Sequence, residues 1–230
     1  MPAFRDACNE KGETERRVKI FRGILSGFLL MLVTASTSQG APLPSWSFSL
    51  KAGAYQPNEP AYDINYGDPR AFRGDLELGY KITRQIEAGL SVGYFMDNGF
   101  ALGVDGRQSG VKQQLVLIPT QLYLLYQFAF KDDQFLVPYL GGGYTHVTYR
   151  RTVEGQGAVM GGKEGYHARA GLKLLLNLLE PTPANELYES WGIIHTYFLL
   201  EGQYARVNGF GNSAVNLGGW SYFGGLQFEF

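Results

Sequence analysis

A chain of 230 residues is long enough for one domain with a complete core. It contains 31 Gly, 15 Tyr and 15 Phe against a single Cys, which is typical of many short strands with tight turns rather than of a helical bundle. The net charge is −1, and residues 1–40 hold six basic and four acidic groups, which leaves 14 basic and 17 acidic groups, or −3, in the remainder. This balance lacks the basic surface that nucleic-acid binding needs, so no nucleic-acid partner is expected.

The N-terminal region has the pattern of a secretory signal peptide. Basic residues between positions 16 and 22 precede an apolar run over 24–33, and small residues follow over 35–41. We predict cleavage after Gly40, so that residues 1–40 are removed and 41–230 form the mature domain. An uncleaved anchor is the less favoured alternative, because a membrane-spanning helix needs ~20 apolar residues. A translation start near Val18 is a further alternative.

Cysteine usage excludes a disulfide framework. The only cysteine, Cys8, lies in the predicted leader, so the mature domain would have no disulfide and no cysteine to carry a lipid anchor. A closed barrel in lipid offers another source of stability, because all its backbone groups are paired.

Eight segments of the mature domain alternate apolar and polar residues with the period of two that strands require. The predicted strands cover residues 46–55, 72–82, 86–94, 115–130, 136–150, 166–174, 197–204 and 220–230. In the fourth, Pro119 predicts a bulge or a lost ladder bond. In the fifth, Gly141-Gly142-Gly143 blurs the period, so its two faces stay unassigned.

The connections between these segments differ in length. Long connections are expected at 56–71, 96–113, 151–165 and 207–217, with short ones at 83–84 and 131–134. Bacterial outer-membrane barrels place short turns in the periplasm and long loops outside. The connection over 176–193 is long, although it lies at the end of the barrel where turns should be short. We interpret it as a periplasmic insertion with a short helix over 184–190.

A soluble lipocalin-like barrel or a β-sandwich would show the same alternation, with its apolar face turned inward. Two details favour the membrane orientation. Tyr, Trp and Phe gather near the strand ends of the apolar faces, as in the aromatic girdles of membrane barrels. The opposite faces combine Gly and Ser with long charged residues, as a narrow and filled lumen requires.

The C-terminal residues form the most specific motif. The chain ends on a phenylalanine, with apolar residues at every second position before it: Leu226, Phe228 and Phe230. Together with the leader and the eight segments, this ending resembles the small eight-stranded outer-membrane barrels of the OmpA-transmembrane-domain, OmpX and OmpW-like group. The segment Val137-Pro138-Tyr139-Leu140-Gly141-Gly142-Gly143-Tyr144 is similar to a Pro-Tyr-x-Gly-x-Gly strand of that group.

The resemblance implies an all-β fold, an eight-stranded antiparallel up-and-down transmembrane barrel with a polar, filled interior. It also implies a bacterial outer-membrane location and a role for Leu226, Phe228 and Phe230 as the signal read by the barrel-assembly machinery. The nearest similarity is to uncharacterised members, so it implies hardly any activity.

Charged residues on the predicted inward faces form the main candidate site. They are Lys51, Arg73, Asp75, Glu77, Lys81, Glu87, Arg169, Lys173 and Glu201. Buried ions must pair, because an isolated one costs several kcal/mol. We interpret the set as a structural network that fills the lumen; the alternative is a gated ion path in which the pairs exchange.

Other residue types offer weaker candidates. His146, His167 and His195 lie in different segments, without metal-ligand spacing. A lipid-modifying site would need a histidine in contact with a serine such as Ser91 or Ser221 and with an acid such as Glu87. Gly155 to Gly165 and Gly209 to Gly211 are expected to be loops rather than phosphate-binding motifs.

Four aspartates in the long loops are weak candidates for calcium or cation-bridged lipopolysaccharide: Asp63, Asp68, Asp97 and Asp105. Scattered loop carboxylates are usually only solvated, so no catalytic residue, metal ligand or cofactor is assigned.

The sequence therefore predicts an outer-membrane barrel with a structural or surface-interaction role through its extracellular loops. A narrow OmpW-like passive channel is the alternative, and a lipid A-modifying enzyme comes third. The expected partners are outer-membrane lipids, lipopolysaccharide and the barrel-assembly machinery, and a monomer is expected.

Overall fold

The computed structural model describes residues 46–58, 62, 71–102, 108–131, 133–211 and 215–230. The predicted leader over 1–40, with Cys8, and the loop aspartates Asp63, Asp68 and Asp105 lie outside these residues. The described strands are β1 (Trp46–Pro57), β2 (Ala71–Lys81), β3 (Ile86–Leu102), β4 (Gln108–Gln127), β5 (Leu136–Val153), β6 (Val159–Leu175), β7 (His195–Arg206) and β8 (Gly219–Glu229). One helix, α3 (Pro181–Trp191), lies between β6 and β7.

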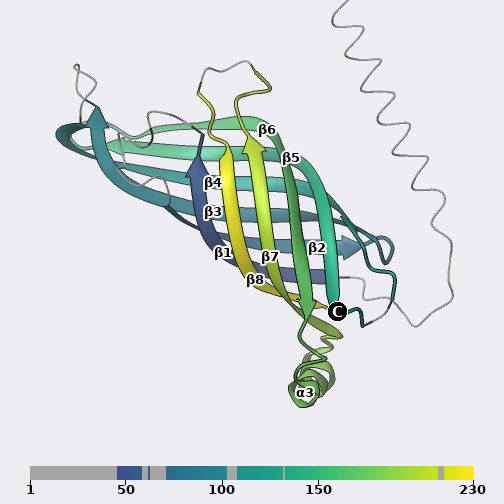
Figure 1. Cartoon of the computed structure of the whole chain (residues 1–230). Coiled ribbons are helices and arrows are strands. Elements are labelled where there is room, and N and C mark those ends of the chain that lie inside the picture. Colours follow the sequence, from purple (N-terminus) through teal and green to yellow (C-terminus); the bar gives the residue numbers. More distant parts are fainter. Residues whose placement is uncertain (1–45, 59–61, 63–70, 103–107, 132, 212–214) are drawn as a thin grey trace, which may run out of the picture. The chain divides into compact units, whose positions relative to one another are not determined.

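The eight strands form a closed barrel in which each pairs antiparallel with its neighbours in sequence, and β1 pairs with β8 (Figure 1). At the closing seam Phe48 lies opposite Phe228, and Leu50 lies opposite Leu226. The predicted eight-stranded up-and-down barrel is confirmed. Closure pairs both edges of the sheet, so the backbone groups of the strands bond within the barrel.

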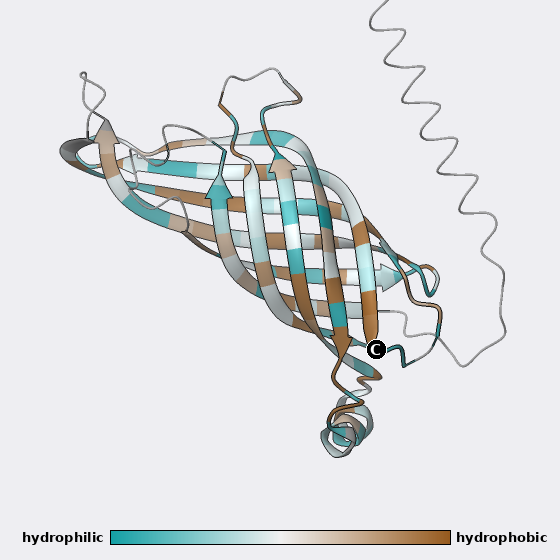
Figure 2. Cartoon of the chain, viewed as in Figure 1, coloured by the Kyte–Doolittle hydropathy of each residue, from teal (hydrophilic) through white to brown (hydrophobic). Residues whose placement is uncertain are grey.

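Apolar side chains face outward and polar ones face inward. In β1, Trp46, Phe48 and Leu50 are exposed, whereas Ser47 and Ser49 between them are buried. The same alternation runs through β2, β3, β7 and β8, and Figure 2 shows it as bands along the strands. Among the described residues no helix is long and apolar enough to cross a membrane. The outward apolar residues of the barrel lie in its strands.

The exposed aromatic residues gather at the two ends of this outer surface. At the end with the short turns 82–85 and 131–135, called the turn end below, Trp46 packs edge-on against Tyr80 with ring centroids 5.1 Å apart. At the opposite end, called the loop end, Trp220 lies 5.1 Å from Tyr204 and 6.2 Å from Tyr222. These are the positions of the interfacial girdles of a membrane barrel.

Two predicted loops are wrong in extent. Most of 96–113 belongs to β3 and β4, and most of 151–165 belongs to β5 and β6, so the Gly155–Gly165 piece is a tight turn followed by a strand. Backbone pairing continues past the apolar surface, from Tyr144 opposite Tyr166 to Arg151 opposite Val159. Figure 1 shows these four strands reaching beyond the others at the loop end, where they form a raised wall. This wall is called the extension below.

The ambiguous fifth strand has clear faces in the structure. Val137, Tyr139, Thr145 and Val147 are buried in the lumen, while Leu140 is exposed between them. The sequence could not show this, because glycine carries no polarity signal.

Pro119 causes a local loss of ladder pairing rather than a bulge. Pairing with β3 stops after Thr120 and resumes at Leu117 in the same register, while pairing with β5 is continuous through Pro119. The register shift lies instead between Phe100 and Leu102 in the extension.

The connection over 176–193 contains a helix, as expected. Helix α3 begins with Pro181 in its first turn and ends at Gly192, whose positive φ of 69° and N–H bond to the Tyr188 carbonyl oxygen form the C-cap. Figure 1 shows α3 beyond the turn end of the barrel.

Candidate functional site

The lumen holds a set of buried charged side chains. All nine residues predicted to face inward point into it, and Glu229 of β8 joins them as a tenth. Counting Glu229, these ten are five cations and five carboxylates, so their formal charges cancel. Their contacts fall into layers between the loop end and the turn end.

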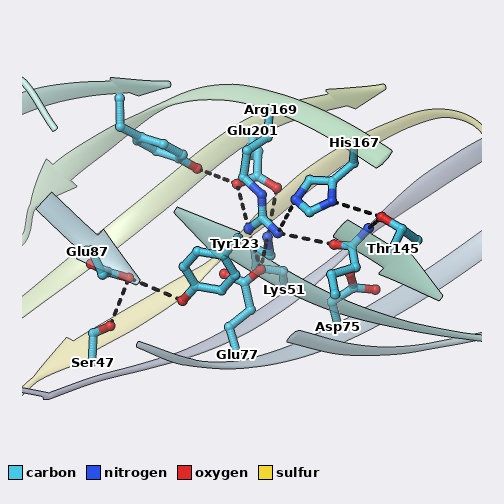
Figure 3. Close-up of polar contacts among 12 residues, drawn as sticks. Ser47, Lys51, Asp75, Glu77, Glu87, Tyr123, Thr145, His167, Arg169 and Glu201 are labelled. Atoms are coloured by element: carbon cyan, nitrogen blue, oxygen red, sulfur yellow. Dashed lines mark hydrogen bonds and ion pairs between the residues drawn. The ribbon is translucent and has the colours of Figure 1, made fainter. Parts of the chain in front are cut away.

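The central layer joins four strands across the lumen. Lys51 Nζ of β1 lies 2.8 Å from Glu77 Oε1 of β2 and 2.7 Å from Glu201 Oε1 of β7. Arg169 Nη1 of β6 lies 2.5 Å from Glu77 Oε1 and 3.7 Å from Glu201 Oε2. Each cation thus contacts both carboxylates, as Figure 3 shows for the cluster. A change in one of the four leaves charge uncompensated on the other side of the barrel.

Uncharged groups complete this layer. Arg169 Nη2 donates to Gln121 Oε1 at 3.1 Å, and the Tyr139 hydroxyl donates to Glu201 Oε2 at 2.8 Å. The Arg169 guanidinium lies 4.5 Å from the centroid of the Tyr123 ring, which adds a cation–π contact. The buried charges therefore have hydrogen-bonding partners that compensate for lost water.

The layer nearer the loop end is a self-contained ion pair. Arg73 Nε and Nη2 contact Asp75 Oδ1 and Oδ2 at 2.8 and 2.6 Å, and Arg73 Nη1 donates to Ser221 Oγ at 3.1 Å. Such a bidentate pair is both strong and directional. Above it, Tyr55, Phe95 and Leu117 belong to a buried apolar cluster that closes the lumen toward the loop end.

Two further layers lie nearer the turn end. Glu87 accepts bonds from Ser47 at 3.0 Å, Tyr123 at 3.2 Å and Gln127 at 2.6 Å, and Lys173 Nζ lies 3.5 Å from it.

The last layer is centred on Glu229. Its Oε1 lies 2.5 Å from Lys81 Nζ, and its Oε2 lies 3.2 Å from His195 Nδ1. His195 Nε2 in turn contacts Asp133 Oδ1 at 3.2 Å in the turn between β4 and β5.

Inward glycines make room for inward tyrosines. A Cβ placed on Gly89 would lie 2.4 Å from the Tyr123 hydroxyl, and one on Gly171 would lie 2.6 Å from that of Tyr139. Both tyrosines bond to carboxylates of the network. These glycines therefore allow a barrel of only eight strands to hold large rings beside its charges.

A pocket of about 350 Å³ opens at the loop end, above the apolar cluster. Its walls are mostly apolar and include Tyr55, Leu115, Leu117, Tyr149, Val159 and Leu217. Arg151 and Lys163 add two cations, of which Lys163 donates to the Val215 carbonyl oxygen at 2.8 Å. We call this the mouth pocket. The next cavity below it, around Arg73 and Gln121, measures only about 20 Å³, roughly enough for one water molecule.

The structure does not bring a histidine to a serine within the described part of the chain. His167 Nδ1 contacts Thr145 Oγ1 at 2.8 Å and its Nε2 lies 3.4 Å from Arg169, while His195 contacts Asp133 and Glu229. Ser221 is bonded to Arg73. Across the residues described, no group of three or more His, Cys, Asp or Glu is arranged to hold a metal ion. Asp97, the one loop aspartate described, bonds to the Tyr62 hydroxyl and to the Asn98 N–H.

Comparison with solved structures finds matches along the whole barrel. OprG, an outer membrane protein from Pseudomonas aeruginosa, matches with a TM-score of 0.56 and 15% identity, over 82% of this chain and 97% of its own. Ail, the attachment invasion locus protein of Yersinia pestis, matches with a TM-score of 0.51 and 11% identity, over 81% of this chain and 98% of its own. The chain has the fold of a small outer-membrane barrel.

No family model matches this outer-membrane barrel, and no curated protein matches its sequence. At identities of 11% and 15% the structural matches establish the fold alone. The role of this barrel has to be argued from its own residues.

Sequence reasoning missed two parts of the site. The alternation of the last strand places Glu229 on its inward face, yet the predicted network does not include it, although an inward carboxylate in a set with one cation in excess is a recognisable signal. The mouth pocket had no such signal, because its strand residues Tyr55, Leu117 and Tyr149 meet others, among them Arg151, Val159 and Leu217, in segments that the alternation assigns to loops.

Proposed function

We propose that this chain is an outer-membrane barrel that acts by binding ligands at its extracellular end, with a lumen that serves stability rather than transport. The observation that carries the proposal is the contrast between the two parts of the interior. The lumen is filled by interlocked charges, whereas the mouth pocket above it is open and about 350 Å³ in volume. That volume lies within the usual range of small-molecule sites.

The lining of the mouth pocket defines the class of ligand. Aromatic and aliphatic walls favour an apolar body, and Arg151 at the exposed edge favours an anionic group. The ligand is therefore a small amphipathic anion. Ail was solved in complex with the heparin analogue sucrose octasulfate, so a barrel of this fold has been seen with a sulfated ligand.

A narrow passive channel is the second candidate, since the mouth pocket and the small cavity below it share Tyr55, Leu117 and Leu217. The cavity of about 20 Å³ and the buried central layer give this candidate less support. Stepwise currents through the wild-type protein in planar bilayers, altered by Glu77→Gln, would favour the channel over the binding site.

The placement in the cell and the partners belong to the same proposal. Residues 1–40 are a leader that is removed on export, and the loop end faces outside. Leu226, Phe228 and Phe230 lie at the seam with β1, where the Phe230 N–H bonds to the Trp46 carbonyl oxygen at 2.9 Å. This position suits a final strand that the assembly machinery reads before closure. Lipids and lipopolysaccharide surround a monomer.

The binding proposal is tested with 1-naphthalenesulfonate, a fluorescent anion with an apolar body. We expect saturable binding to the barrel in lipid nanodiscs and a loss of about tenfold in affinity for Arg151→Gln, the size of one charge-assisted hydrogen bond. Arg150 is the matched control, because it is the next residue of β5 and is exposed on the opposite face of the strand. Arg150→Gln should bind like the wild type, whereas equal losses in both variants, or no saturable binding at all, would contradict the proposal.

A further inference from the structure

The connection between β6 and β7 leaves an apolar surface uncovered at the turn end. Leu178 is 53% exposed, Leu179 63%, Tyr188 60% and Trp191 74%. Trp191 is the most exposed large apolar side chain among the described residues. Side chains of this kind are costly in water, so several of them in one short connection indicate a surface that something covers.

Two of these side chains belong to one stripe of α3. Ala184, Leu187, Tyr188 and Trp191 follow the spacing that places residues on one helix face. Ala184 and Leu187 are half-buried and line a groove together with Leu176 of the connection, whereas Tyr188 and Trp191 remain open. Exposed polar residues lie on the other side of the helix, among them Glu186 and Glu189.

Hydrogen bonds hold the connection against the barrel. Asn177 Nδ2 donates to the Ile194 carbonyl oxygen at 2.8 Å, and Asn177 Oδ1 accepts from the Thr196 N–H at 2.8 Å. The Ile194 N–H bonds to the Glu229 carbonyl oxygen at 2.7 Å. The apolar face of α3 therefore has a defined position next to the ends of β6, β7 and β8.

Exposed apolar residues also lie on the outside of the barrel, in the two strands that flank this connection. Leu172 of β6 and Phe198 and Leu200 of β7 are exposed on the outward face, and Leu178 and Leu179 lie a few residues after the end of β6 at Leu175. Trp46 and Tyr80 form the aromatic girdle at this end. Trp and Tyr side chains favour the boundary between hydrocarbon and headgroups.

We propose that α3 is an interfacial foot, which lies in the headgroup region of the periplasmic leaflet and inserts Leu178, Leu179, Tyr188 and Trp191 among the lipids. The inference rests on the membrane location of the barrel and not on the mouth pocket. The acidic residues of α3 and the absence of basic residues from its last turn suit a zwitterionic rather than an anionic headgroup. The foot would fix the depth of the barrel in the bilayer at one side of its turn end.

The test uses the fluorescence of Trp191. The chain has three tryptophans, Trp46, Trp191 and Trp220, so the variant Trp46→Phe/Trp220→Phe leaves Trp191 as the only reporter. The protein is folded into phosphatidylcholine vesicles with or without bromine on the acyl chains close to the headgroup. We expect a blue-shifted emission that falls by about half in the brominated vesicles and resists aqueous iodide, as for a side chain buried by ~5–10 Å.

Two controls separate the possible causes of failure. Adding Trp191→Phe and Glu186→Trp moves the reporter to the opposite, acidic face of α3, where iodide should quench it and bromine should not. Trp191→Phe/Trp220→Phe leaves Trp46 in the girdle, where bromine should quench. Quenching of Trp191 by iodide and not by bromine would overturn the foot, and would point to open water or a soluble partner. If Trp46 also failed to respond to bromine, the membrane location itself would be wrong.

Discussion

At the scale of single residues, the interior of this barrel depends on pairing. Lys51 and Arg169 each contact both Glu77 and Glu201, so no charge of the central layer has only one partner. Burying such ions is costly, and the mutual attraction within the set offsets that cost only while the set is complete. Replacing one member of an ion pair should therefore lower the stability of the fold more than replacing both members with neutral residues.

The Arg73–Asp75 pair tests this property directly, because the two residues bond mainly to each other. Asp75→Asn keeps the shape of the side chain but leaves Arg73 buried beside a neutral amide. We expect a loss of about 3–5 kcal/mol in the free energy of unfolding, and we expect Arg73→Met/Asp75→Asn to recover most of it. Equilibrium unfolding in guanidinium, followed by tryptophan fluorescence in lipid vesicles, measures both. If the loss in the free energy of unfolding of the double variant equals the sum of the losses of the two single variants, the two residues do not act as a pair.

The inward position of these residues could be predicted from the sequence, but their partners could not. Alternation in β2 assigns Arg73, Asp75 and Glu77 to one face with no knowledge of the fold. The contact between Glu77 and Arg169 joins residues 92 positions apart in the chain, and it depends on barrel closure and strand stagger. The same limit applies to the contact of Glu229, whose partner Lys81 lies two strands away across the seam.

At the scale of elements, strand positions were predictable and strand lengths were not. The predicted 86–94 and 166–174 are strands of 17 residues, Ile86–Leu102 and Val159–Leu175. Beyond the apolar surface the outward residues become polar, as Thr148 and Arg150 do in β5, so the alternation that marks a membrane strand disappears. Hydrogen bonds between strands continue without it. The helix expected over 184–190 begins earlier, at Pro181, because a proline in the first turn needs no N–H donor and fits the helix start.

The tip of the β5–β6 hairpin, which is part of the extension, is expected to be separable from the barrel. Arg150 and Met160 lie opposite each other, so residues 151–159 can be replaced by an Asn-Gly turn without a change of register. We expect the shortened chain to fold, with a change of about 1 kcal/mol or less in the free energy of unfolding, because the removed residues lie outside the lipid. It should also lose 1-naphthalenesulfonate binding, since Arg151 and Val159 line the mouth pocket.

Fluorescence titration and the unfolding curve of the same preparation check both outcomes. A shortened chain that folds and still binds the probe would move the ligand site away from the mouth pocket. A chain that cannot fold would show that the barrel needs the extension.

At the scale of the whole molecule, the protein is built with its polar side inward. Leu50, Leu76 and Leu78 are each about half exposed, while Lys51, Asp75 and Glu77 beside them are buried. In water this arrangement would expose a wide apolar surface and bury charge, and both are unfavourable. In a bilayer the outer surface contacts hydrocarbon and the charges are removed from it. The fold is therefore stable only where the outer surface of the barrel contacts lipid.

One measurement tests that orientation most directly. Leu76 lies on the outward face at the middle of β2, and Leu76→Arg places a charge against the centre of the hydrocarbon. Phe100→Arg is the matched control, since Phe100 is an outward apolar residue of the extension, paired with Lys112 outside the lipid-facing surface. We predict that Leu76→Arg lowers the free energy of unfolding in phosphatidylcholine bilayers by about 2–4 kcal/mol and Phe100→Arg by about 1 kcal/mol or less. Equal stability of Leu76→Arg and the wild type would mean that the apolar face does not contact lipid, and would contradict the account.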